Sequence, residues 1–191
     1  MMESLYIARS KIRQDLLALF FTNLSKRYYL REIQRMLGYS AGSIRRELLK
    51  FQKDKMFITQ HEGNLLYYSL NIKHPLFKEL KSIVEKTVGI QGSLTRALAN
   101  IKKIKTAFIY GSFAARHEKG TSDIDVMIIG TPNMSQLNEK IAELEKRLNR
   151  EINVTVYSLA EYKTRKNAHR GFIQELLKNP KIMLIGDERD L

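Results

Sequence analysis

Residues 10–37 carry hydrophobic positions at helical spacing. The first apolar stripe recurs at i, i+4, i+7 and i+8, as Ile12, Leu16, Leu19 and Phe20. A second, shorter stripe runs from Leu30 to Leu37 and stops at Gly38, where a left-handed backbone conformation can end a helix. The pattern therefore predicts two helices, with a turn directly after the second.

The next segment predicts a third helix and then a β-hairpin. Ser40 can cap the helix, and apolar residues at i, i+4 and i+7 give it a buried face, namely Ile44, Leu48 and Phe51. Two β-favouring runs follow at 56–59 and 65–70, separated by turn-forming residues at 60–64. We expect three helices and a hairpin within residues 10–72.

A connecting segment follows. Pro75 interrupts the pattern, because the residue before a proline is disfavoured in the helical region. Helical spacing then resumes from Leu76 to about Lys86 and predicts a linker helix within residues 73–91. The glycines of the stretch 89–92 predict a flexible joint at its end.

The second half alternates helices and strands. Nearly continuous apolar runs at 106–110 and 126–129 predict buried strands. A helix over about 137–148 leads into an alternating strand around 152–156, and a last short strand is expected at 182–185. This order predicts a small mixed-sheet α/β domain over residues 92–191.

Composition excludes several classes of protein. The 191 residues are 43% hydrophobic, with only 3 Pro and 10 Gly, so the chain can bury a core. No apolar run reaches the roughly 18 to 20 residues of a membrane span, and no secretory pattern opens the chain, so a cytoplasmic protein with no membrane partner is expected. With no cysteine and four scattered histidines, any catalytic metal must bind oxygen ligands.

Net charge adds a class of partner. The chain carries 33 Lys and Arg against 20 Asp and Glu, a formal charge of +13. Residues 1–90 hold 16 of these basic residues and 8 of the acidic ones, so the excess is concentrated in the first half. Such an excess favours polyanionic partners, which include nucleic acids and nucleotides.

Small polar and basic residues gather on the third predicted helix, as Ser40, Ser43, Arg45, Arg46 and Lys50. The stretch 39–48 resembles the recognition helix of bacterial and archaeal winged helix-turn-helix regulators. The resemblance covers about residues 10–72 and implies a DNA-binding domain at 1–72, usually working as a homodimer on paired half-sites. A second interpretation is a basic, solvated face on a small helical or dimerisation module.

Two carboxylates stand at the start of the strand near residue 126. Asp123 and Asp125 are two residues apart, so in a strand they point to the same face. Such a pair repels itself unless a cation neutralises it, and Mg²⁺ prefers these oxygen ligands. The preceding strand ends on Gly111 and Ser112, which can bring backbone and hydroxyl groups close to a phosphate.

Tyr110–Ala114 together with Asp123–Val126 closely resembles the minimal nucleotidyltransferases of the DNA polymerase beta-like superfamily. The resemblance covers about residues 92–186 and implies that Gly111 and Ser112 bind the triphosphate while Asp123 and Asp125 hold Mg²⁺. It implies an NTP donor, with ATP expected, and a small-molecule or protein hydroxyl as acceptor. Arg116 is predicted to contact phosphate, although a solvated basic turn is an equally good interpretation.

The third carboxylate of that superfamily aligns most naturally with Asn153, which is neutral. Glu151, two residues earlier on the same strand face, is the candidate substitute and completes the predicted catalytic set. Alternatively, Glu151 pairs with a surface cation such as Lys146 or Arg150. In that case the domain binds nucleotide without transferring it.

The expected fold class is therefore α+β, with an N-terminal winged helix-turn-helix followed by a small nucleotidyltransferase domain. The expected function is a DNA-binding protein with Mg²⁺-dependent nucleotidyltransferase activity. The alternative is a transcriptional regulator or antitoxin whose second domain binds a nucleotide or a protein partner without catalysis.

Overall fold

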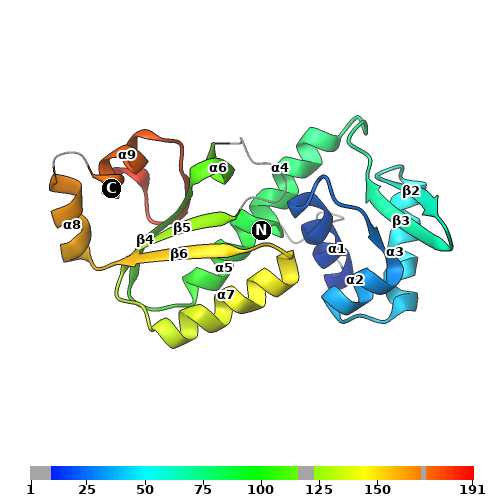
Figure 1. Ribbon diagram of the computed structural model, residues 1–191, viewed down its shortest axis with the longest axis horizontal. Helices are drawn as coiled ribbons and strands as arrows, with labels where there is room; N and C mark the ends of the chain where they lie inside the picture. The colour runs from blue at the N-terminus through cyan, green and yellow to red at the C-terminus, as the bar shows by residue number, and fades with distance from the viewer. Residues whose placement is uncertain (1–9, 116–122, 169–170) are drawn as a thin grey trace. The chain divides into compact units, whose positions relative to one another are not determined.

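A computed structural model describes residues 10–115, 123–168 and 171–191 of the protein (Figure 1). The chain divides into two compact units. Unit 1 comprises Met1–Ile90 with Lys146–Asn149, and unit 2 comprises Gln91–Glu145 with Arg150–Leu191. Both contain helices and a small sheet, so the α+β class is confirmed.

Unit 1 contains three helices, a small sheet and a fourth helix. In chain order these are α1 (Lys11–Thr22), β1 (Tyr28–Tyr29), α2 (Leu30–Leu37), α3 (Ala41–Lys53), β2 (Phe57–Glu62), β3 (Leu65–Leu70) and α4 (Phe77–Thr87). The sheet has the order β1-β3-β2 and is antiparallel throughout. The predicted helices and hairpin are present, whereas the two-residue strand β1 is too short to leave a periodic signal.

Local chemistry sets the ends of these helices. Ser10 caps α1 by accepting a hydrogen bond from the backbone of Arg13, and Ser40 caps α3 in the same way through Ser43. Gly38 follows α2 with a φ of +74°, a left-handed conformation that favours glycine. The turn between α2 and α3 is thus encoded chiefly by Gly38 and Ser40.

Aromatic packing and one ion-pair network hold unit 1 together. The Phe20 ring of α1 lies 4.4 Å from that of Phe57 on β2, and both side chains are almost fully buried. Arg13 of α1 pairs with Glu47 of α3 at 2.9 Å, and Lys50 pairs with the same carboxylate at 2.8 Å. The network ties α3 to α1 through a nearly buried charge pair.

The joint predicted at residues 89–92 falls where the chain divides into its two units, between Ile90 and Gln91. α4 ends at Thr87 and the next helix, α5 (Ile90–Ala99), already contains Gly92. Gly89 forms a tight turn, since a Cβ there would lie 2.9 Å from both the Val84 carbonyl oxygen and the Glu85 Cα. Glycine is needed here for close backbone packing, and the flexibility of the joint stays a prediction.

Unit 2 is built on a four-stranded mixed sheet. After α5 it contains β4 (Ile104–Tyr110), α6 (Gly111–Ala114), β5 (Ile124–Gly130), α7 (Met134–Leu148), β6 (Ile152–Tyr157), α8 (Leu159–Asn167), α9 (Phe172–Lys178), β7 (Ile182–Ile185) and the 3₁₀ turn Glu188–Asp190. The strand order is β6-β5-β4-β7. β5 and β6 are parallel, and β4 is antiparallel to both of its neighbours.

Helices cover both faces of this sheet. α5 and α7 lie on one side of it in Figure 1, and α8 and α9 lie on the other. The α8–α9 face packs Tyr162, Ile173 and Leu176 against Phe108 and Met127 of the central strands. Among the helices of residues 10–115, 123–168 and 171–191, none is long and apolar enough to cross a membrane.

Candidate functional site

The chain turns sharply where β4 ends. Tyr110 is the last strand residue, and Gly111 has a φ of +74° at the start of α6. A Cβ on Gly111 would lie 2.7 Å from Asp125 Oδ2, so the carboxylate passes directly against the backbone of this turn. Glycine is required both for the left-handed conformation and for the close approach.

Strand register brings side chains from three strands to one face. Tyr110 on β4 pairs with Asp125 on β5, and Asp125 pairs with Asn153 on β6. Asp123 lies two residues before Asp125, just ahead of β5, and its Oδ2 accepts a hydrogen bond of 3.3 Å from Asn153 Nδ2. The predicted carboxylate pair is thus assembled together with Asn153.

The environment disfavours a second negative charge at this place. Burial is the main cause that raises the pKa of Asp125, and the neighbouring Asp123 charge raises it further. The Asn153 amide, which lies beside both carboxylates, offsets part of this rise. A cation would relieve the repulsion between the two carboxylates, and the atoms they offer as metal ligands are oxygens. Asp123 and Asp125 therefore fit Mg²⁺, which binds through carboxylate oxygens.

Glu151 is not gathered with the two aspartates. Its side chain is exposed, while its backbone oxygen accepts a 3.0 Å hydrogen bond from the Ile124 N–H. Within the described ranges, no three Asp, Glu, His or Cys side chains are grouped to hold a metal. Asn153 is the third side chain at the pair, and the catalytic role of Glu151 stays a prediction. Arg116 lies outside the described residues.

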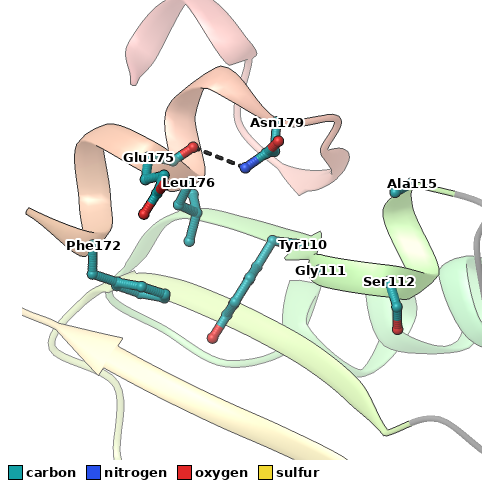
Figure 2. A pocket seen from close by; sticks show the side chains of 8 residues that line it. All are labelled: Tyr110, Gly111, Ser112, Ala115, Phe172, Glu175, Leu176 and Asn179. Atoms are coloured by element: carbon teal, nitrogen blue, oxygen red, sulfur yellow. Dashed lines mark hydrogen bonds between the residues drawn. The ribbon is translucent and has the colours of Figure 1, made fainter.

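A pocket of about 450 Å³ adjoins the Gly111 turn (Figure 2). Its walls come from β4, α6 and α9, through Tyr110, Gly111, Ser112, Ala115, Phe172, Glu175, Leu176 and Asn179. The rings of Tyr110 and Phe172 meet edge to face with centroids 5.9 Å apart. Ser112, which the sequence predicts to bind the triphosphate, is exposed and lines this pocket.

Sequence reasoning missed the α9 side of this pocket. Ile173 and Leu176 are buried at i, i+3 spacing after Gly171, which is a weak signal for a seven-residue helix. On such a helix, Phe172, Glu175 and Asn179 fall at i, i+3 and i+7, and they share the face that lines the pocket. This spacing is the signal that could have found them.

The residues predicted to bind DNA lie on α3 and at its start. Ser40 caps the helix, its hydroxyl donates to Ser43 Oγ at 2.9 Å, and Arg46 donates to the same Ser43 oxygen at 3.2 Å. Arg45 and Arg46 are exposed. Lys50 is already paired with Glu47, so its charge is partly neutralised within unit 1. The structure thus leaves the two arginines as the most available cations of the five predicted residues.

Comparison with known proteins gives a match to one family and weak likenesses to solved structures, of which two are described. The family described as "Polymerase beta, Nucleotidyltransferase" matches residues 93–188. A crystal structure of a toxin–antitoxin with AMP-PNP is 18% identical, with a TM-score of 0.39, covering 52% of this chain and 76% of the other. A mutant of the toxin–antitoxin MntA-HpeT is 17% identical, with a TM-score of 0.38, covering 53% and 76%. No curated protein matches the chain.

Proposed function

The chain belongs to the polymerase beta nucleotidyltransferase family, and on that premise we propose that unit 2 is a Mg²⁺-dependent transferase. It moves a nucleoside monophosphate from an NTP, with ATP as the proposed donor, to a hydroxyl of a small molecule or protein. The observation that carries this proposal is the Asp123–Asp125 pair held against the Gly111 turn. That placement puts metal ligands beside a backbone that a phosphate can approach closely.

Each residue has a distinct role in this proposal. Gly111 exposes its backbone to the triphosphate, and Ser112 offers an N–H and a hydroxyl as hydrogen-bond donors. Asp123 and Asp125 hold Mg²⁺, which when bound neutralises phosphate charge and activates the acceptor hydroxyl. Asn153 orients Asp123 through its amide hydrogen bond. Arg116 remains the proposed additional phosphate contact.

Glu151 is the proposed third acid. Its backbone is hydrogen bonded to Ile124, the residue between the two aspartates, so its side chain starts beside the pair. The carboxylate is exposed, and in this proposal it turns towards the pair when Mg²⁺ is bound. Loss of transfer but not of nucleotide binding in Glu151→Gln would support this role.

The direct experiment compares wild type with Asp123→Asn and Asp125→Asn. Binding of ATP is measured by calorimetry with Mg²⁺ and with EDTA, and pyrophosphate release is measured with candidate acceptors. We expect Mg²⁺-dependent binding in the wild type and loss of both signals in the variants. Equal ATP affinity in all three proteins, with or without Mg²⁺, would contradict the proposed site.

A second proposed function is DNA binding by unit 1 as a winged helix-turn-helix. The supporting observation is the α2–α3 pair joined at Gly38, with Arg45 and Arg46 exposed on α3 and an antiparallel hairpin after it. The proposed assembly is a homodimer that reads paired half-sites. Its oligomeric state is measurable by light scattering.

Arg45→Ala combined with Arg46→Ala tests this second function. We expect weaker DNA binding in a mobility-shift assay and a shallower dependence of affinity on salt. Lys73→Ala combined with Lys78→Ala removes the same charge from exposed positions outside α3 and is the control. Equal losses in both double variants would reduce the interaction to general charge attraction.

A regulator or antitoxin without catalysis is the alternative proposal for the whole chain. It is supported by Asn153, a neutral residue where a third carboxylate would strengthen metal binding. In that case ATP binds unit 2, or a protein partner does, with no pyrophosphate released under any condition. Turnover that disappears in Asp123→Asn would exclude this alternative.

A further inference from the structure

The pocket beside Gly111 has one end, at Phe172 and Glu175, that suits a group other than phosphate. The lining residues that the structure describes include no Lys, Arg or His, and one of them, Glu175, is acidic. A triphosphate carries several negative charges and would be repelled by that carboxylate. The aromatic and aliphatic side chains of Tyr110, Phe172 and Leu176 instead suit a flat, uncharged group.

Phe172 supplies the surface on which such a group can stack. Its side chain is 53% exposed although it is large and apolar, and its ring contacts that of Tyr110 edge to face. An edge-to-face pair leaves ring faces open for a third aromatic group. A nucleobase placed there would cover apolar area that now faces solvent.

The two ends of the pocket differ in polarity, as the phosphate and base ends of a nucleotide do. Gly111 and Ser112 border one end, where the proposed phosphate contacts lie. In Figure 2 the rings of Tyr110 and Phe172 and the side chain of Glu175 lie to one side, and Ser112 lies to the other. An extended nucleotide therefore fits with its phosphates at Ser112 and its base at Phe172.

Glu175 adds a preference among bases. An ionised carboxylate is a hydrogen-bond acceptor only, so it favours a base with an N–H donor on its edge. An exocyclic amino group provides that donor in adenine, guanine and cytosine. Hypoxanthine and uracil lack the amino group, and their ring N–H donors lie next to carbonyl oxygens that a carboxylate repels.

We propose that the pocket formed by Tyr110, Phe172 and Glu175 binds the base of the nucleotide donor and selects bases that carry an exocyclic amino group. The proposal rests on the nucleotide-binding function of unit 2. It separates the residues that hold phosphate, at Gly111 and Ser112, from those that identify the base.

The experiment measures binding of three probes with Mg²⁺ by calorimetry: ATP, ITP and inorganic tripolyphosphate. Phe172→Ala should weaken ATP binding about tenfold, the scale of one base–aromatic stack, and leave tripolyphosphate binding unchanged. Phe172→Tyr keeps a ring and should retain ATP affinity. Leu159→Ala, which truncates another exposed apolar side chain of unit 2, is the control and should change nothing. Thermal melts check that each variant is folded.

Glu175→Gln tests base selection. The wild type should bind ATP more tightly than ITP by roughly tenfold, the scale of a hydrogen bond to a charged group, and the variant should lose most of that ratio. Equal binding of ATP and ITP by the wild type would overturn the selection of an amino group. Equal weakening of ATP and tripolyphosphate by Phe172→Ala would overturn the base pocket.

Ser112→Ala distinguishes the proposed base pocket from the proposed nucleotide binding by unit 2, on which it rests. It should weaken ATP and tripolyphosphate alike, because both present phosphates to Ser112. If the wild type binds neither probe, the proposed nucleotide site itself is wrong. If it binds both, and Phe172→Ala changes neither, only the base pocket is wrong.

Discussion

Gly111 and Asp125 approach each other so closely that an added methyl group on the glycine would lie 2.7 Å from the carboxylate oxygen. Gly111→Ala should therefore displace Asp125 and strain the left-handed backbone, at a cost of about 1 to 3 kcal/mol in unfolding free energy. We expect ATP affinity to fall in the same variant. Denaturation and calorimetry measure the two effects.

Gly42→Ala is the matched control for that substitution. Apart from its chain neighbours and the backbone of its own helix α3, no described atom lies within 4 Å of a Cβ at Gly42. Alanine should stabilise the helix there by about 0.5 to 1 kcal/mol. An equal destabilisation by both glycine variants would show that neither the contact with Asp125 nor the backbone angle matters.

Asn153→Asp should make unit 2 more dependent on divalent cations. A third carboxylate beside Asp123 and Asp125 adds repulsion in EDTA and adds a ligand when Mg²⁺ is present. The expected result is a lower melting temperature in EDTA and a larger rise on addition of Mg²⁺ than in the wild type. Asn153→Ala, which removes the amide without adding charge, should not show the larger rise.

Glu47 should make unit 1 sensitive to acid. Burial alone would raise the pKa of Glu47, but hydrogen bonds from Lys50 and Arg13 outweigh it and lower the pKa below its ordinary value of 4.5. The unfolded chain then takes up the proton more readily than the folded one. The stabilisation is therefore complete above about pH 4.5 to 5 and is lost as pH falls through the lowered pKa.

Glu47→Gln measures this contribution. At pH 7 we expect a loss of about 2 kcal/mol of unfolding free energy, because the Arg13 guanidinium keeps its place without its charged partner. The difference from wild type should shrink when urea denaturation is repeated towards pH 3. A difference that stays constant with pH would show that the ionised carboxylate is not what stabilises the α1–α3 contact.

The Tyr39 hydroxyl should lose its proton at a higher pH than an ordinary tyrosine. Burial, a 2.7 Å hydrogen bond to Asp15 Oδ2 and the charge of that carboxylate raise the pKa of Tyr39 to about 12. The raised pKa means that this stabilisation is complete below about pH 10 and disappears as pH rises towards 12. Tyr39→Phe should cost about 1 kcal/mol at neutral pH and remove the latest phase of the tyrosinate absorbance titration.

Periodicity predicted most helices because their buried faces repeat. Ile44, Leu48 and Phe51 are all buried on α3, as their spacing indicates. Shorter elements carry too few residues to show a period, which is why β1 and α9 were not predicted. The close backbone packing at Gly89 was not predicted, because the sequence does not show the backbone atoms that a Cβ there would contact.

Those parts of the site that lie within one element were also predictable from residue spacing. Asp123 and Asp125 belong to one strand, so their common face follows from spacing alone. The hydrogen bond from Asn153 depends on the pairing of β6 with β5, and Phe172 reaches the pocket only through the packing of α9. Such contacts between distant segments are set by tertiary structure.

The sheet of unit 2 is completed by its last strand. β7 pairs with β4 through Ile182 and Ile109, which are far apart in sequence, and α9 immediately precedes β7. During synthesis on the ribosome, β4 and β5 can pair and bring Asp125 to Gly111 while β4 still has an open edge. Until β7 is present, β4 has one unpaired edge, and such an edge is the kind of surface that can pair with another chain.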